Sequence, residues 1–176
     1  MSRLPLTEPK GLPPFLRELH DGASEQDWST KRTARAFSAN PQLLEDYLKF
    51  YYPWHRSDGV GLLEPRLKEL VRLRIATLNG CKTCKAARLD PTVTEEEAMT
   101  GVDDPSDAFT DRERAAIAVA EKMAIDHFSI DNDAIRALKG LFNEGEILEL
   151  MMMAGQYIGF GRMLAILQLE EVSCPI

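Results

Sequence analysis

The segment from Glu64 to Arg88, EPRLKELVRLRIATLNGCKTCKAAR, is the feature that most constrains how this chain can fold. Pro65 suits the first turn of a helix, and the apolar residues that follow wrap well beyond one stripe of the helix surface. We therefore expect a helix that is buried on most of its surface. Asn79-Gly80 is typical of a helix end, and a second helix is expected from Cys81 to about Leu89.

The other segments of the chain show helix-start residues followed by apolar residues at helical spacing. Pro53 is expected to end one helix, and Thr94 with Glu97 and Thr110 with Glu113 have the spacing of capping boxes. No segment of useful length alternates in the manner of a β-strand, so the sequence predicts an all-α fold. In residue numbers, the expected helices are 15–20, 27–39, 41–53, 64–78, 81–89, 111–127, 131–141 and 144–169, with a further short helix after Thr94.

The last of these helices contains Gly155, Gly159 and Gly161, each of which costs roughly 1 kcal/mol relative to alanine. Helices tolerate glycine where another backbone must approach closely. We therefore expect this helix in the tightest packing of the molecule, and it is a candidate for a contact between subunits.

Length and composition indicate one globular domain over residues 1–176, with the proline-rich residues 1–14 as an extended N-terminal arm. The net charge is −7 without any lysine- or arginine-rich run, which disfavours a nucleic-acid partner. The opening residues lack the apolar core of a signal peptide. The most apolar segment, Met151 to Leu167, contains Gln156 and Arg162 and is short for a bilayer span, so no membrane partner is expected.

Cys81 and Cys84 are two of only three cysteines in the chain, which fits a thiol pair in a reducing cytoplasm better than a secreted disulfide scaffold. At a helix start, the first thiol faces unpaired backbone N–H groups and the positive end of the helix dipole, which favour its thiolate. Lys82, Lys85 and Arg88 add positive charge nearby. The second thiol lies one turn along, close enough to form a disulfide within the motif.

Three interpretations of the thiol pair compete. A zinc site usually needs four ligands, but the third cysteine, Cys174, is near the C-terminus, and His20, His55 and His127 show no ligand spacing. We therefore predict no metal and no other cofactor. Both cysteines could instead be small buried hydrophobic residues. The helix-start position and the neighbouring cations favour redox chemistry over packing.

Glu69 lies twelve residues before the first cysteine, on the helix that precedes the motif. A partly desolvated carboxylate near a thiol can relay protons during thiol activation. The alternative is a surface ion pair with Arg66 or Arg72, which lie three residues away on the same helix. The spacing does not distinguish these two interpretations.

The PRLKELVRLRIA helix, the NGCKTC motif and a later T-x-R-E helix together resemble the carboxymuconolactone decarboxylase-like superfamily, and within it the alkyl hydroperoxidase D-like branch. The resemblance covers roughly residues 41–169, and its most specific part is Glu69 with the two motif cysteines. It implies a multi-helix orthogonal bundle that assembles as a homo-oligomer, a trimer, a hexamer or a dimer, with the thiol pair beside a subunit interface. It also implies that Cys81 and Cys84 are the redox pair and that Glu69 supports them.

Two positions depart from the branch pattern, which has a histidine between the cysteines and another seven residues after the first. This chain has Thr83 and Arg88 at those positions. Arginine is effectively always charged and does not relay a proton, so the full proton relay of the branch does not carry over. Arg88 could still lower a thiol pKa or hold an anionic group of a substrate.

The sequence therefore predicts a cytoplasmic antioxidant enzyme, a thiol-dependent peroxidase that reduces hydroperoxides and is restored by an external dithiol donor. Cys81, as the residue at the helix start, is expected to be the more thiolate-like sulfur. Glu69 is the expected proton relay and Arg88 a charge stabiliser. The alternatives are a lyase that acts on a small carboxylated compound held by Arg88, and a non-catalytic helical oligomer. His55 is interpreted as a structural histidine.

Overall fold

The computed structural model describes residues 2–25, 27–55, 59–98 and 109–170. These residues form helices and connections without any strand, so the predicted all-α fold is confirmed. The α-helices are α1 (Pro14–Gly22), α2 (Trp28–Ala36), α3 (Pro41–His55), α4 (Pro65–Leu78), α5 (Lys82–Ala86), α6 (Asp111–Ile125), α7 (Asn132–Lys139) and α8 (Glu144–Ile166). Short 3-10 helices cover Pro9–Gly11, Phe37–Ala39 and His127–Ser129.

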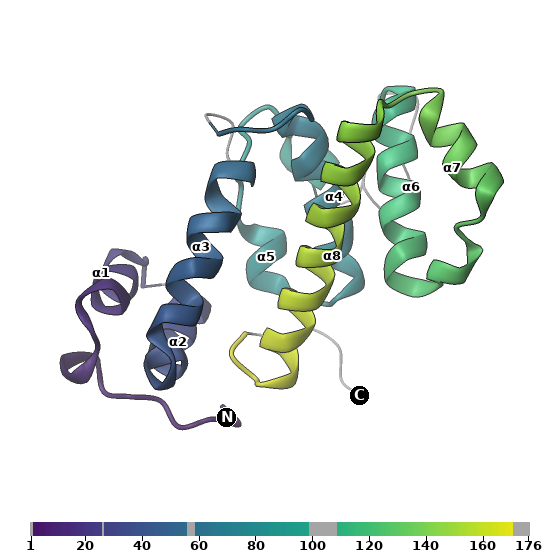
Figure 1. Cartoon of the computed structure of the whole chain (residues 1–176). Coiled ribbons are helices and arrows are strands. Elements are labelled where there is room, and N and C mark those ends of the chain that lie inside the picture. The colour runs from purple at the N-terminus through teal and green to yellow at the C-terminus, as the bar shows by residue number, and fades with distance from the viewer. Residues whose placement is uncertain (1, 26, 56–58, 99–108, 171–176) are drawn as a thin grey trace.

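Helix α4 is the centre of the fold. It packs against α6 and α8, and most of its side chains are buried, as the sequence predicts. Figure 1 shows α8 crossing in front of α4, with α1, α2 and α3 on one side and α6 and α7 on the other. Apolar side chains of α4, α6 and α8 form one buried cluster, which includes Leu67, Val71, Ile75, Ala116, Ala120, Leu150, Met153 and Tyr157.

Helix α3 continues through Pro53 to His55, so the prediction that Pro53 ends it is wrong. Proline removes one backbone donor and usually ends or bends a helix. Here the last turn is held from the side, because His55 is buried, stacks on Tyr51 with ring centroids 4.9 Å apart and is hydrogen-bonded to Tyr157 of α8. These tertiary contacts of the last residue outweigh the local preference.

Helix α5 begins after Cys81 as expected but ends at Ala86, three residues before the predicted end at Leu89. The reason lies in α4, where Arg72 binds the backbone carbonyl oxygens of Cys84 and Ala87. Those acceptors are then satisfied without further helix, and Ala87 adopts an extended conformation with φ −66° and ψ 143°.

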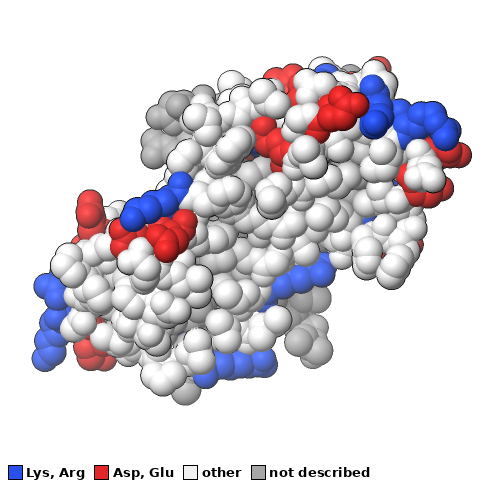
Figure 2. Space-filling model, in the orientation of Figure 1, with Lys and Arg blue, Asp and Glu red and all other residues white. Residues whose placement is uncertain are grey.

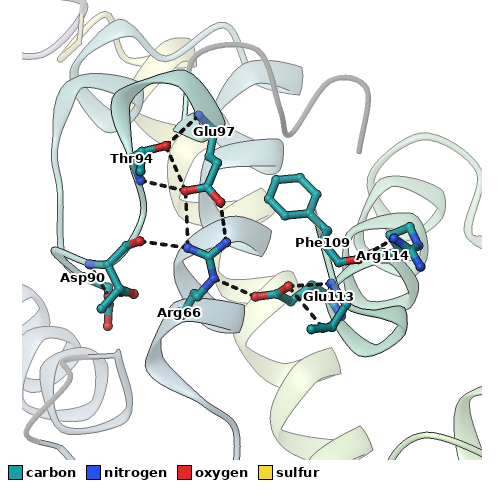
Figure 3. Close-up of polar contacts among 9 residues, drawn as sticks. Arg66, Asp90, Thr94, Glu97, Phe109, Glu113 and Arg114 are labelled. Carbon is teal, nitrogen blue, oxygen red and sulfur yellow. Dashed lines mark hydrogen bonds and ion pairs between the residues drawn. The ribbon is translucent and has the colours of Figure 1, made fainter. Parts of the chain in front are cut away.

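Both predicted capping boxes form, and one arginine joins them (Figure 3). Arg66 of α4 donates to Glu97 at 2.5 Å and to Glu113 at 2.8 Å, the two glutamates that close the boxes begun by Thr94 and Thr110. A further bond from Arg66 reaches the carbonyl of Thr92 at 2.8 Å. The first turns of two segments are thereby tied to the start of α4.

Helix α8 is the last helix of the described chain, and Gly155, Gly159 and Gly161 of this helix differ in how closely they pack. At Gly155 an added Cβ would lie 3.3 Å from Cε of Met123. A Cβ added at Gly161 would lie 2.6 Å from Nδ2 of Asn79, whose amide also donates to the Tyr157 carbonyl of α8 at 3.3 Å. At Gly159, by contrast, nothing in the described chain lies within 4 Å of such a Cβ. Of Gly159 and Gly161, only Gly161 therefore shows the expected close packing. Within the described ranges, no helix combines the length and apolar character needed to cross a membrane.

The N-terminal arm is bound to the rest of the fold at two places. The backbone N–H of Arg3 donates to the carbonyl of Leu167 at 3.0 Å, and Arg35 of α2 donates through Nε to the Thr7 carbonyl at 2.8 Å. The arm therefore connects α2 with the end of α8.

Replacing the arginine between the two capping boxes tests their contribution to stability. We expect Arg66→Gln to lower the free energy of unfolding by roughly 2 kcal/mol, because Glu113, itself largely buried, and Glu97 both lose a charged donor. Urea unfolding followed by circular dichroism measures this difference. The control is Arg136→Gln, whose ion pair with Asp133 is exposed on both sides and should change stability by less than about 0.5 kcal/mol. Equal effects of the two substitutions would contradict the proposed linkage.

Candidate functional site

The structure joins Cys81 and Cys84 in a disulfide, with Cα atoms 5.3 Å apart. Cys81 is the N-cap residue of α5, and its sulfur accepts the backbone N–H of Cys84 at 3.0 Å. Cys81 is 1% exposed, whereas Cys84 is half-buried. The third cysteine, Cys174, which we interpret as incidental, lies outside the described residues.

Both cysteines line a cavity of about 340 Å³. Most of its wall consists of apolar and tyrosine side chains from α3, α4 and α8, among them Tyr47, Leu48, Tyr51, Ile75, Tyr157, Phe160 and Leu164, whereas α2 contributes Ser29, Thr30 and Thr33. Thr83, which stands between the cysteines, and Arg72 also contribute to the wall. The disulfide therefore faces a space that can hold an apolar or aromatic group next to the sulfurs.

Glu69 is 1% exposed and is held by a two-point ion pair with Arg72. Arg72 Nε donates to one carboxylate oxygen and its terminal nitrogen to the other, each at 2.7 Å. The backbone N–H of Leu89 adds a third bond at 3.1 Å. Because Arg72 also binds the Cys84 and Ala87 carbonyls, the pair holds α5 at the second motif cysteine and at its C-terminal end.

The charge state of Glu69 follows from these contacts. Burial alone would raise the pKa of this carboxyl, but the hydrogen bonds and charge of Arg72 outweigh it and lower the pKa to about 2. Glu69 is therefore a carboxylate at any physiological pH. Of the two ion-pair partners that the sequence offered, the structure selects Arg72, and the pair is buried rather than on the surface.

His55 lies on the other side of Glu69. Its Nδ1 is hydrogen-bonded to the Tyr157 hydroxyl, and its Nε2 is 3.7 Å from a Glu69 oxygen, too far for a hydrogen bond. Burial lowers the pKa of His55, which keeps the imidazole neutral near pH 7. The side chain is thus fixed within the fold and is not among the residues that line the cavity.

Arg88 contacts groups other than the two cysteine sulfurs. It forms a two-point ion pair with Glu95, at 3.0 and 2.8 Å, and donates to the carbonyls of Lys85 at 2.5 Å and Ala87 at 2.9 Å. It is not among the cavity-lining residues. The structure therefore brings Glu69, Cys81 and Cys84 together through Arg72 and leaves Arg88 at the outer end of the segment.

Glu170 is a residue of this site that sequence reasoning missed. It is 4% exposed, and its Oε2 lies 3.7 Å from the Cys84 sulfur. Its carboxyl and the two sulfurs lie within 4.8 Å of one another. In the sequence, Glu170 belongs to the pair Glu170-Glu171 after a long helix. Two adjacent acidic residues at such a position predict side chains exposed to solvent. With the sulfurs joined in a disulfide, neither is the thiolate that a metal ion requires.

Comparison with known proteins supports the fold. No protein-family model matches the chain, and no curated protein matches it in sequence. Two solved structures resemble it over 98% of its length. One is an uncharacterized peroxidase-related protein from a Silicibacter species, with 20% identity, 91% of that chain covered and a TM-score of 0.71. The other is the alkylhydroperoxidase AhpD core, an uncharacterized peroxidase-related protein from Ralstonia eutropha, with 16% identity, 93% covered and a TM-score of 0.70.

The fold is therefore that of a peroxidase-related all-helical protein. More particularly, it is the AhpD-like fold that the resemblance in the sequence implies. At these low identities the similarity establishes the architecture, and the activity of this chain has to be argued from its own residues.

Removing the charge of Glu69 should weaken the fold in a pH-dependent way. We expect Glu69→Gln to cost roughly 3 kcal/mol near pH 7, because it leaves Arg72 buried without its counterion. The folded pKa of about 2 lies below the ordinary value of 4.5, so this stabilisation is complete above pH 4.5 and is lost as the pH falls toward 2. Urea titrations at several pH values should show the difference between wild type and variant shrinking over that range. A difference that stays constant with pH would contradict the assignment, and Asp133→Asn, an exposed change, is the control.

Proposed function

We propose that this protein is a thiol-dependent peroxidase that uses Cys81 and Cys84 as its redox pair. The observation that carries the proposal is the cysteine pair itself, which lies within disulfide distance at the start of α5 and lines an apolar cavity. The similarity to peroxidase-related structures supports it. The tyrosine-rich wall suits an organic hydroperoxide with an apolar substituent.

The first step is attack by a thiolate on the peroxide. Cys81 is the candidate from the sequence, and the backbone N–H of Cys84 that its sulfur accepts is the kind of contact that stabilises a thiolate. The sulfur forms a bond to the outer oxygen, the O–O bond breaks, and the alcohol leaves after taking up a proton. Cys81 is thereby oxidised to a sulfenic acid and the peroxide is reduced.

The second step closes the disulfide. The Cys84 sulfur displaces the sulfenic oxygen, which leaves as water, and the Cys81–Cys84 bond forms. An external dithiol then reduces this bond by thiol–disulfide exchange and becomes a disulfide itself. A donor of this kind works in a reducing compartment, so we assign the activity to the cytoplasm.

The contacts of Glu69 and Arg88 bear on the roles expected for them, which are proton relay for Glu69 and charge stabilisation for Arg88. As a carboxylate with a pKa of about 2, Glu69 is a weak base, and its contacts support a positioning role through Arg72 better than proton relay. Arg88 is paired with Glu95 and bound to carbonyls, which supports a role in shaping the end of α5. These contacts also give no support for a lyase in which Arg88 holds a substrate carboxylate.

We also propose that the chain acts as a homo-oligomer, with α8 in the interface. Leu148 and Met152 stand on this helix and are 71% and 62% exposed. In Figure 1, α8 lies at the front of the molecule. Figure 2 shows the same face, and its central part carries few charged side chains. Exposed apolar surface of this kind is typical of an interaction site.

Stopped-flow measurement of hydroperoxide consumption tests the catalytic proposal. Protein that has been reduced and freed of excess thiol should consume cumene hydroperoxide and lose two thiols as the disulfide forms. Cys84→Ser should lose only one thiol and form no disulfide within the motif. The same variant should accumulate a sulfenic acid on Cys81, which dimedone traps for mass spectrometry. Cys174→Ser is the matched control and should lose two thiols as wild type does. If Cys84→Ser and wild type behave alike, the redox-pair mechanism is wrong.

Sedimentation velocity tests the proposed interface. We expect Met152→Glu to shift the protein toward smaller species, because a buried charge in an apolar contact is unfavourable. Phe128→Glu removes an apolar side chain that is even more exposed, at 86%, but lies outside α8, and should leave the assembly unchanged. A wild-type protein that sediments as a monomer would refute the proposal.

A further inference from the structure

The end of α8 directs a carboxyl group onto the thiol pair. Gln168 has a φ of +55°, the left-handed conformation in which glycine is usual. Its N–H donates to the carbonyl of Ala165 at 3.0 Å, and the N–H of Leu169 donates to that of Leu164 at 2.9 Å. These are the two bonds of a Schellman motif. The turn buries Leu169 completely, and the next residue, Glu170, then faces α5.

The carboxyl of Glu170 has no other polar partner in the described part of the chain. Its Oε1 is buried without a hydrogen-bond partner, and its Oε2 is 3.7 Å from the Cys84 sulfur. A buried polar group without a partner is costly and calls for an explanation, of which a redox or catalytic role is one. Among the described residues, both motif sulfurs lie within 4.8 Å of this carboxyl, and the one at hydrogen-bond distance is that of Cys84.

We propose that Glu170 is the acid–base group of Cys84, taking the thiol proton as the disulfide closes and supplying a proton to the Cys84 thiolate as the disulfide is reduced. The inference rests on the proposed redox function for its place in a reaction. The contact itself is independent of that function.

The proton and electrons balance in both directions. During closure, the Cys84 sulfur forms the bond to Cys81, its proton moves to Glu170, the S–O bond of the sulfenic acid breaks, and the departing hydroxide takes a proton from Glu170 to leave as water. During reduction, a donor thiolate bonds to the Cys81 sulfur and the S–S bond breaks. The electron pair goes to Cys84, which Glu170, reprotonated from solvent after closure, protonates. The second thiolate of the donor then attacks the donor sulfur bonded to Cys81, so that the donor is oxidised to a disulfide and Cys81 leaves as a thiolate.

The surroundings of Glu170 leave it suited to this exchange. Burial raises its pKa to about 7, so that acid and base forms are both populated near neutral pH. Burial is the cause of this shift, and the charged residues on the neighbouring helices include Lys82 and Lys85 of α5, Glu69 and Arg72 of α4, and Arg162 of α8. Arg72 is engaged with Glu69, and Arg162 binds Asn79 and the Ala124 carbonyl.

Glu69, the other buried carboxylate of the site, does not serve in this role. Arg72 occupies both of its oxygens and keeps it ionised, whereas Glu170 has a free oxygen and touches a sulfur. The two glutamates thus divide the work, one as an anchor and one as the proton partner.

The test uses protein in which Cys84 is the only cysteine, made with Cys81→Ser and Cys174→Ser. The rate of iodoacetamide alkylation against pH reports the ionisation of this thiol, with EDTA present to exclude metal. With Glu170 in place, thiol and carboxyl titrate as a coupled pair, and the carboxylate raises the thiol pKa. We expect Glu170→Gln to move the profile to lower pH by about one unit or more and to remove the inflection that belongs to the carboxyl. Glu121→Gln, at a half-buried position on α6 where the carboxylate pairs with Arg74, should leave the profile unchanged.

A second measurement follows disulfide closure in otherwise native protein after one equivalent of hydroperoxide. Glu170→Gln should slow closure by roughly 100-fold near pH 7 and let the Cys81 sulfenic acid accumulate, and Glu170→Asp should be intermediate. An alkylation profile that Glu170→Gln does not move overturns the inference. If wild type reacts with no peroxide, the proposed function fails, while the alkylation profile still decides whether Glu170 and Cys84 share a proton. Should Glu170→Gln fail to fold, the carboxyl infrared band of wild type, recorded oxidised and reduced, gives the same decision: a band unaffected by reduction overturns the inference.

Discussion

The buried pair of Glu69 and Arg72 is the interaction on which the rest of the site depends. Two charges removed from water are unfavourable unless their partners satisfy them closely. Here each carboxylate oxygen receives a guanidinium nitrogen at 2.7 Å, and Arg72 spends its remaining donors on the Cys84 and Ala87 carbonyls. The same pair therefore ends α5 after a single turn and fixes the thiols against α4. An apolar pair of equal volume could fill the space but would leave those carbonyls without donors.

The site places two buried carboxyl groups in opposite environments. The pKa of Glu69 is lowered to about 2 because arginine and backbone donors surround it, whereas burial without a charged partner raises that of Glu170 to about 7. Pairs of acids separated in this way commonly divide structural and proton-transfer roles. In the mechanism proposed above, Glu170 at the end of α8 supplies the proton transfer, which fits the departure from the branch pattern at Arg88.

Much of the architecture could be predicted from local patterns. The capping boxes at Thr94 and Thr110 and the stop at Asn79-Gly80 form as expected, since each depends on residues three or four positions apart. The failures came where a distant residue decided the outcome. His55 extends α3 beyond Pro53 through its bond to Tyr157, and Arg72 shortens α5. Glu170 was missed because Gln168, not glycine, adopts the left-handed turn that directs it inward.

The sequence by itself determined the helical class, the buried character of α4 and the spacing that puts two thiols one turn apart. Helical periodicity, capping and hydrophobic burial depend on residues close together in the sequence, so they can be predicted from it. Only the tertiary structure decided which charges meet: Arg72 rather than Arg66 on Glu69, Glu95 on Arg88, and Glu170 on Cys84. The ionisation of a carboxyl depends on the donors and the burial that the folded chain brings to it from outside its own helix, and that is why the chemistry of this site became visible only in three dimensions.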